Sequence, residues 1–282
     1  MTLRIVSWNV AYRTGPTASR QGAFLAKLNP DLVLLQEVNP RSSASLVAES
    51  GLDWLVRAVD VRAAQPDDLP VRRRGVAIGG RGMAPEMVAL LSEAVRLPER
   101  MLTASVVLDG RLVTVVSYHA PPGVTWGMDK VRHAWACEAW LGHQHGPVVM
   151  GADANTPEYD MPDFMLTRTH WHTGMRKLAG ERGDDILFGP DADHNLTDAL
   201  RSWLQQHPKE MERITLEYPN GPLALSHRTG KRKESPGFDR RFDAIWLSPE
   251  FQVEQITYPY EESIEAGSDH SAVVADVAFQ DL

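Results

Sequence analysis

The segment Gly267-Ser268-Asp269-His270-Ser271-Ala272-Val273-Val274-Ala275 joins a short polar turn to an apolar, β-branched run. Glycine and serine favour a turn, and the run that follows predicts a buried strand. Asp269 and His270 are therefore expected at the mouth of that strand. A carboxylate can hold a divalent cation, and an imidazole can carry a proton or bind a phosphate. The functional interpretation of this pair is strengthened because polar clusters upstream also stand at the ends of apolar runs.

Similar apolar runs recur along the chain and predict eight buried strands. These are Leu3-Trp8, Leu32-Leu35, Val76-Ile78, Ser105-Leu108, Leu112-Ser117, Val148-Met150, Phe242-Leu247 and Ala272-Ala278. Helical patterns cover Ser19-Leu28, Arg41-Glu49, Met128-Leu141 and Asp198-Gln206, the last with Thr197 as its expected N-cap. Consecutive strands mixed with strand–helix alternation predict an α/β sandwich of two packed sheets with helices outside. Because no repeat or linker-like tract interrupts the pattern, we expect one domain over 1–282, with an irregular insertion at about 156–196.

The composition, 43% hydrophobic and 23% charged, is that of a globular protein with a real core. A formal net charge of -8 disfavours indiscriminate binding to nucleic acid, although two basic patches, Arg72-Arg73-Arg74 and the segment 228–241, could act locally. The single cysteine, Cys137, excludes an intrachain disulfide and a cysteine metal cluster. No membrane anchor or secretory signal is recognisable, and no obligate protein partner is evident. These features favour the cytoplasm.

Polar clusters stand at the ends of the predicted strands. They are Trp8-Asn9, Gln36-Glu37, Ser117-Tyr118-His119, Asp153-Ala154-Asn155, Arg241-Phe242-Asp243 and Ser268-Asp269-His270. Polar side chains are costly to bury at such ends unless they are paired or bind an ion. The alternative for each residue is ordinary capping and turn chemistry. Taken together, the clusters predict one site at a common sheet edge, and their oxygen and imidazole ligands suit Mg²⁺ or Mn²⁺.

In this order the six clusters resemble the endonuclease/exonuclease/phosphatase superfamily, which includes deoxyribonuclease I and exonuclease III-type repair nucleases. The resemblance runs from residue 8 to residue 270. It implies a four-layer α/β sandwich with two mixed β-sheets flanked by helices, in agreement with the pattern of strands and helices. It also implies a metal-dependent phosphoesterase. The fourth cluster departs slightly from the family, because Ala152 stands between Gly151 and Asp153.

The resemblance assigns a role to each polar cluster. Glu37 is expected to be the main metal ligand, helped by Asn9 and Asp269. Asp243 is expected to orient His270, and either His270 or Asp153 would be the general base, with Asn155 orienting the water or the phosphate. His119 would face the leaving oxygen. In deoxyribonuclease-like members an acid near the strand matching Gly75-Ile78 orients this histidine, but here that neighbourhood is Arg72-Arg73-Arg74-Gly75, without an acid.

The arginines at this position bear on the pKa of His119 and on substrate binding. A nearby arginine would lower the pKa of His119, so phosphate binding is its expected role. We expect Arg74 to hold substrate phosphate, and Arg241 to contact substrate because its basic segment runs into Asp243.

Three functions remain open on sequence alone. The first is a nuclease, with DNA favoured over RNA. The second is a phosphatase or phosphodiesterase of a small phosphorylated metabolite or lipid headgroup, which the acidic net charge fits at least as well. The third is a binding module without activity, which the complete set of expected site residues disfavours.

Overall fold

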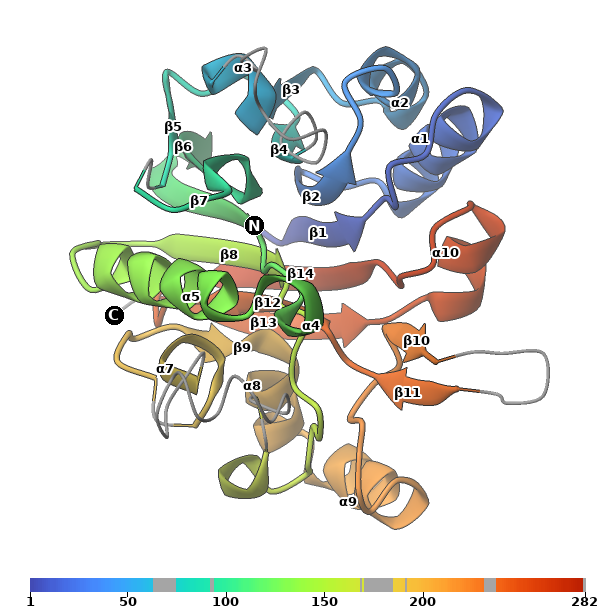
Figure 1. The fold of residues 1–282 in the computed structure, drawn as a ribbon, viewed down its shortest axis with the longest axis vertical. Helices are drawn as coiled ribbons and strands as arrows, with labels where there is room; N and C mark the ends of the chain where they lie inside the picture. The colour runs from blue at the N-terminus through green and yellow to red at the C-terminus, as the bar shows by residue number, and fades with distance from the viewer. Residues whose placement is uncertain are drawn as a thin grey trace.

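The computed structural model describes residues 1–62, 75–91, 94–167, 169, 185–190, 192–230 and 237–280. Two six-stranded mixed sheets dominate it (Figure 1). The first sheet has the order β13 (Phe251–Thr257), β14 (Val273–Phe279), β1 (Leu3–Asn9), β2 (Leu32–Val38), β4 (Gly75–Gly80) and β3 (Trp54–Arg57). The second has the order β5 (Met87–Leu90), β6 (Met101–Leu108), β7 (Arg111–His119), β8 (Val148–Asp153), β12 (Asp243–Leu247) and β9 (Thr197–Asp198). All eight predicted strands are present.

The central strands are buried on both faces, which makes four layers. Successive residues of a strand point to opposite faces, so Ile5 packs between the sheets while its neighbour Val6 packs against helices. Helices α1 (Pro16–Leu28) and α2 (Ser43–Ser50) cover the outer face of the first sheet. Helices α5 (Met128–Leu141) and α7 (Asp185–Phe188) cover the outer face of the second. The expected four-layer α/β sandwich is therefore confirmed.

The two sheets are in close contact at Gly151, two residues before Asp153. A Cβ atom on Gly151 would lie 2.7 Å from Cδ1 of Leu34 and 2.8 Å from Oγ of Ser7, so only glycine fits in β8 at this point. Buried Gln36 donates from Nε2 to Ser7 and Ser117, and thereby links β2 to a strand of the opposite sheet. These contacts fix the spacing of the sheets beside the site.

Helices α8 (Ala199–Gln206) and α9 (Pro208–Glu217) follow the insertion, and Leu200 and Leu204 extend the core between the sheets. The expected N-cap of α8, Thr197, is wrong by one residue. Oδ1 of Asp198 accepts hydrogen bonds from the backbone N–H groups of Leu200 and Arg201, because a carboxylate reaches the free N–H groups of a first turn well.

The remaining elements are short. They are α3 (Ala58–Val61), α4 (Gly123–Trp126), α10 (Tyr260–Glu265), the 3-10 turns Pro98–Arg100 and Phe164–Leu166, and a separate hairpin of β10 (His227–Thr229) and β11 (Phe238–Arg240). In Figure 1 the hairpin projects beside the loop that leads into β14. None of the helices in the described ranges has the length and apolarity to cross a membrane.

Candidate active site

The predicted site residues meet at one edge because of strand direction. Strands β1 and β2 run parallel, as do β7 and β8, so their carboxyl ends coincide in pairs. Strands β12 and β14 run antiparallel to β8 and β1, which brings their first residues to the same edge. In register, Asp153 lies opposite both His119 and Asp243.

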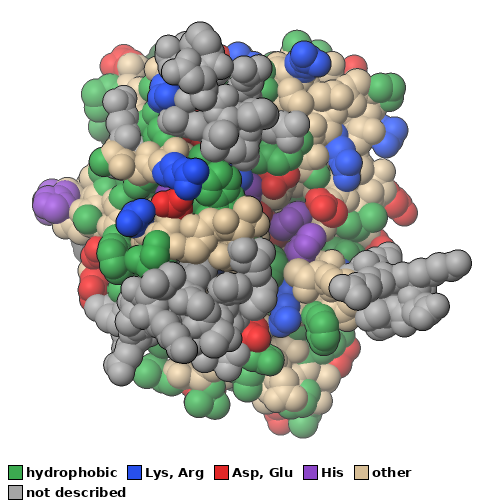
Figure 2. All heavy atoms as spheres, viewed as in Figure 1, with side chains coloured by type: hydrophobic (Ala, Val, Ile, Leu, Met, Phe, Trp, Pro, Cys, Tyr) green, Lys and Arg blue, Asp and Glu red, His purple; other side chains and the backbone are tan. Residues whose placement is uncertain are grey.

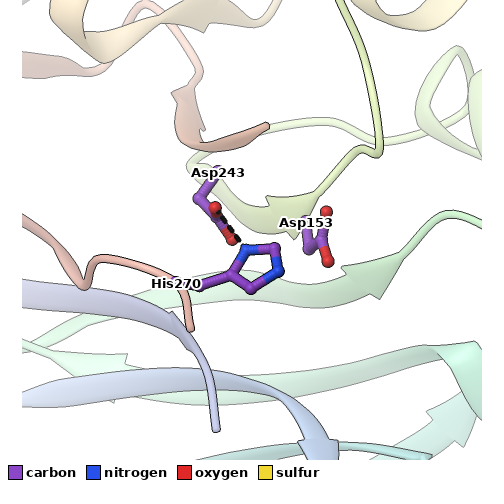
Figure 3. A group of neighbouring side chains, drawn as sticks. All are labelled: Asp153, Asp243 and His270. Carbon is purple, nitrogen blue, oxygen red and sulfur yellow. Dashed lines mark hydrogen bonds and ion pairs between the residues drawn. The ribbon is translucent and has the colours of Figure 1, made fainter. Parts of the chain in front are cut away.

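His270 is buried between two carboxylates (Figure 3). Its Nδ1 donates to Oδ2 of Asp243 at 2.8 Å, and its other ring nitrogen faces Asp153. Burial works against the charged imidazolium, but Asp243 and then Asp153 outweigh it and raise the pKa of His270 to about 10. The indole of Trp8 donates to the backbone oxygen of His270 at 3.0 Å. The backbone N–H of His270 donates to Oγ of Ser268.

Asp153 is buried and held on both oxygens. Its Oδ2 accepts from the Asn9 amide at 2.8 Å, and its Oδ1 accepts from the Asn155 backbone N–H at 3.0 Å. Burial alone would raise the pKa of Asp153, but the charge of His270, with these hydrogen bonds, lowers it below its usual range. Asp153 is therefore ionised at neutral pH and fixed in orientation.

Asn155 stands in a strained backbone position beside Asp153. Its φ of 48° lies in the left-handed region, which is uncommon for a residue other than glycine. The Asn155 amide donates to the oxygen of Ala120 at 3.0 Å, and buried Lys130 donates to the Asn155 carbonyl at 2.7 Å. Contacts on both sides thus hold the loop that follows β8.

Glu37 also has a left-handed backbone, with φ of 56°, and its carbonyl accepts from Tyr12 at 2.9 Å. Burial, with repulsion from Asp153, raises the pKa of Glu37 to about 7. Its nearest ion-pair candidate in the described chain is His119, 3.7 Å from Oε1 to Nε2. Burial and Asp153 outweigh the charges of His270 and Arg100, so a further cation at Glu37 would favour its charged form.

His119 does not supply that cation. It is buried, and its Nε2 lies 3.4 Å from Oδ2 of Asp153. Burial and then the charge of Arg100 hold the pKa of His119 well below its usual range, so the ring is neutral. The sequence predicted a lowered pKa here and an arginine as its cause. Arg74, the arginine it named, lies outside the described residues, and Arg100 acts in the structure.

Two groups of residues could hold a metal ion. Ligand atoms of Asp153, Asp243 and His270 lie within 4.8 Å of one another. In this group the protonated His270 offsets the charge of one of the two carboxylates. Glu37 faces a second negative charge from Asp269 and has no charged partner at ion-pair distance among the described residues. Oxygen ligands suit Mg²⁺ or Mn²⁺, and both groups offer carboxylate oxygens.

Arg241 lies in a different environment from the one predicted. Only 4% of it is exposed, and it forms ion pairs with Asp160 at 2.6 Å and with Asp198 at 2.7 Å. Asp160 also pairs with Arg201 at 2.6 Å. The expectation that Arg241 binds substrate is therefore wrong, because its guanidinium is used to join α8 and the chain after β8 to the start of β12.

The sequence interpretation missed two residues beside the site. Arg100 is buried, and the oxygen of Ala120 lies 3.5 Å from its Nη1. His227, in β10, stacks on His270 with ring centroids 4.1 Å apart and bonds the Asp269 carbonyl through Nδ1. Neither residue follows a predicted strand. The sequence holds only a weak signal for each of them. Arg100 precedes the predicted strand at 105–108, and His227 adjoins the basic segment 228–241.

The fold and the site define a two-sheet α/β protein with a buried acid–histidine centre at one edge. A family model described as "Endonuclease/Exonuclease/phosphatase family" matches residues 6–270, and the chain belongs to this family. The enzymes of the family are phosphoesterases that depend on divalent metals, and the buried acid–histidine group agrees with that. No curated protein matches the chain.

Solved structures share the fold at low identity. TDP2 from D. rerio, in complex with a single-strand DNA product, is 16% identical with a TM-score of 0.66, covering 98% of this chain and 99% of its own. An AP endonuclease from Archaeoglobus fulgidus is 18% identical with a TM-score of 0.63, covering 99% and 100%. An endonuclease/exonuclease/phosphatase from Beutenbergia cavernae is 20% identical with a TM-score of 0.58, covering 99% and 72%. These likenesses establish the fold alone.

Proposed function

We propose that this chain hydrolyses phosphodiester bonds of nucleic acid, DNA rather than RNA, with Mg²⁺ or Mn²⁺ as cofactor. The observation that carries the proposal is the protonated His270, which Asp243 holds opposite the ionised Asp153. A cationic donor facing a fixed carboxylate can bind a phosphate on one side and orient a water molecule on the other.

Each residue then has a distinct role. A metal held by Glu37, Asp269 and Asn9 would neutralise phosphate charge and stabilise the developing oxyanion. His270 donates from Nε2 to a phosphate oxygen, because Nδ1 is engaged by Asp243. Since a group with a pKa near 10 is already protonated at neutral pH, the proton of the attacking water passes to Asp153.

Three further residues complete this mechanism. Asn9 and Asn155 keep the Asp153 carboxylate in position. Neutral His119 donates toward the leaving oxygen.

Two observations bear on the substrate. Similar folds occur in TDP2 with a single-strand DNA product and in an AP endonuclease, which supports nucleic acid. The net charge of -8 supports the second candidate, a small phosphorylated metabolite or lipid headgroup, because a polyanion gains little from an acidic surface.

Activity is tested with purified protein on bis-p-nitrophenyl phosphate and on single-stranded and duplex oligonucleotides, with Mg²⁺ or Mn²⁺ and with EDTA. We expect activity that EDTA abolishes and metal restores. Glu37→Gln and His270→Asn should each lower kcat by about 10² to 10⁴-fold. The matched controls Glu212→Gln and His145→Asn change exposed residues and should leave kcat unchanged.

Full activity of Glu37→Gln or His270→Asn would refute the assigned centre. Hydrolysis of bis-p-nitrophenyl phosphate and of inositol phosphates without cleavage of any oligonucleotide would favour the small-molecule candidate.

A further inference from the structure

A pocket of about 560 Å³ opens beside the candidate active site, and none of the predicted functions accounts for it. Its walls come from the chain just after β8, from the loop at 218–222 and from the β10–β11 hairpin. The volume lies within the roughly 300–1,000 Å³ of pockets that hold small ligands. On the face shown in Figure 2, histidine and acidic side chains gather in a hollow above this hairpin.

The pocket is joined to the active site through the chain and through packing. Pro157 and Glu158, in one wall, follow Asn155 by two and three residues. Arg240, in the other wall, pairs in register with His227, which stacks on His270. Residues directly opposite in an antiparallel pair share a face, so Arg240 and His227 lie on the same face of the hairpin. A substrate phosphate at His270 would therefore have the pocket next to it.

Aromatic side chains line the pocket and remain exposed. Phe238 is 65% exposed, Tyr159 44% and Tyr218 45%. The Arg240 guanidinium lies 5.5 Å from the Phe238 ring centre and 6.0 Å from that of Tyr159. Exposed rings beside an arginine provide the surfaces on which nucleobases stack in proteins that bind single strands.

The charges of the pocket balance. Its lining holds the arginines Arg228, Arg240 and Arg241 and the acids Glu158, Asp160 and Asp239. Arg228 pairs with Asp239 at 2.6 Å, and Arg241 pairs with Asp160 at 2.6 Å. A run of phosphates gains little from a lining without net charge. A flat, uncharged aromatic group is the better occupant.

We propose that this pocket binds an unpaired nucleobase of the strand that is cleaved, stacked on Phe238 and Tyr159. The proposal rests on the proposed nuclease function and narrows it to single-stranded or locally unpaired substrate, because the faces of a base within a duplex are covered by the bases stacked above and below it. The pocket contributes to substrate binding and leaves the chemistry to the residues around His270.

The test compares Phe238→Ala, Tyr159→Ala and the double variant with the wild type on a single-stranded oligonucleotide and on bis-p-nitrophenyl phosphate. Each single variant should raise KM for the oligonucleotide by roughly 5- to 150-fold. The kcat for the oligonucleotide and both constants for the small substrate should stay unchanged. Trp135→Ala, which removes a 43% exposed ring outside the pocket lining, is the matched control.

An unchanged KM for the oligonucleotide in the double variant overturns the proposal, and so does an equal loss on the small substrate. Wild-type protein that cleaves no oligonucleotide overturns the proposed function together with the pocket. Wild-type cleavage with unaffected variants overturns the pocket alone. Binding of a fluorescent single strand to the double variant on a His270→Asn background gives a second readout, and a Kd equal to that of His270→Asn also overturns the pocket.

Discussion

At the scale of single residues, the site is governed by two groups with raised pKa values, one near neutrality and one well above it. The pKa of Glu37 is about 7, because the carboxyl is buried beside Asp153. The pKa of His270 is about 10, because two carboxylates stabilise its charged form against burial. The proposed chemistry needs Glu37 ionised and His270 protonated. Both conditions hold between these two values.

We therefore expect kcat/KM for bis-p-nitrophenyl phosphate to rise as pH passes through about 7 and to fall through about 10. More Mg²⁺ should shift the acidic limb to lower pH, because metal and proton compete for Glu37. Asp243→Asn removes the carboxylate that holds the His270 charge, so it should move the alkaline limb toward neutrality. An alkaline limb at the same pH in Asp243→Asn would show that it does not report His270.

Residues at the ends of long apolar runs could be predicted, whereas residues defined only by packing could not. Asp153, Asp243 and His270 each adjoin a buried strand, and strand direction then brings them together. Arg100 ends a 3-10 turn, and His227 lies in a three-residue strand. The contacts of these two residues depend on tertiary structure, which apolar periodicity does not report.

At the scale of elements, the same distinction separates the strands that were predicted from those that were missed. The eight predicted strands are the central ones of the two sheets, and the four missed in those sheets are their edges, β13, β3, β5 and β9. Central strands are buried on both faces and read as continuous apolar runs. Edge strands alternate with exposed residues, as β13 does, or are very short, as β9 is.

The junction between α8, the chain after β8 and β12 depends on the buried ion pairs of Arg241. Replacing Arg241 by Met leaves the Asp160 and Asp198 carboxylates buried without this partner. We expect the free energy of unfolding, measured in urea, to fall by about 3–5 kcal/mol. Because Arg241 and Arg201 hold the pKa of Asp160 below its usual range, this stabilisation is present at neutral pH and lost as pH falls through that lowered pKa.

The comparison variant is Arg213→Met, which removes exposed pairs with Glu210 and Glu217 and should leave stability nearly unchanged. A raised KM in Arg241→Met with unchanged stability would restore the substrate-binding role that the sequence suggested.

At the scale of the whole molecule, the site is divided between the two sheets. Asn9, Glu37 and the loop with Asp269 and His270 belong to the first sheet. His119, Asp153 and Asp243 belong to the second. The distance between the proposed metal ligands and the proposed base is therefore set by the packing of one sheet on the other, and no single strand determines it.

Gly151→Ala tests this dependence, because its Cβ would lie 2.7 Å from Leu34 Cδ1 and 2.8 Å from Ser7 Oγ. We expect a loss of about 1–3 kcal/mol in the free energy of unfolding as the sheets move apart locally. We also expect kcat for bis-p-nitrophenyl phosphate to fall more than KM rises, since Asp153 shifts relative to Glu37 while the surface pocket is unchanged. Gly142→Ala is the control, because its Cβ would lie 3.7 Å from the backbone oxygen of Glu138, an ordinary van der Waals contact. If Gly151→Ala kept both the stability and the kcat of the wild type, sheet spacing would not set the geometry of the site.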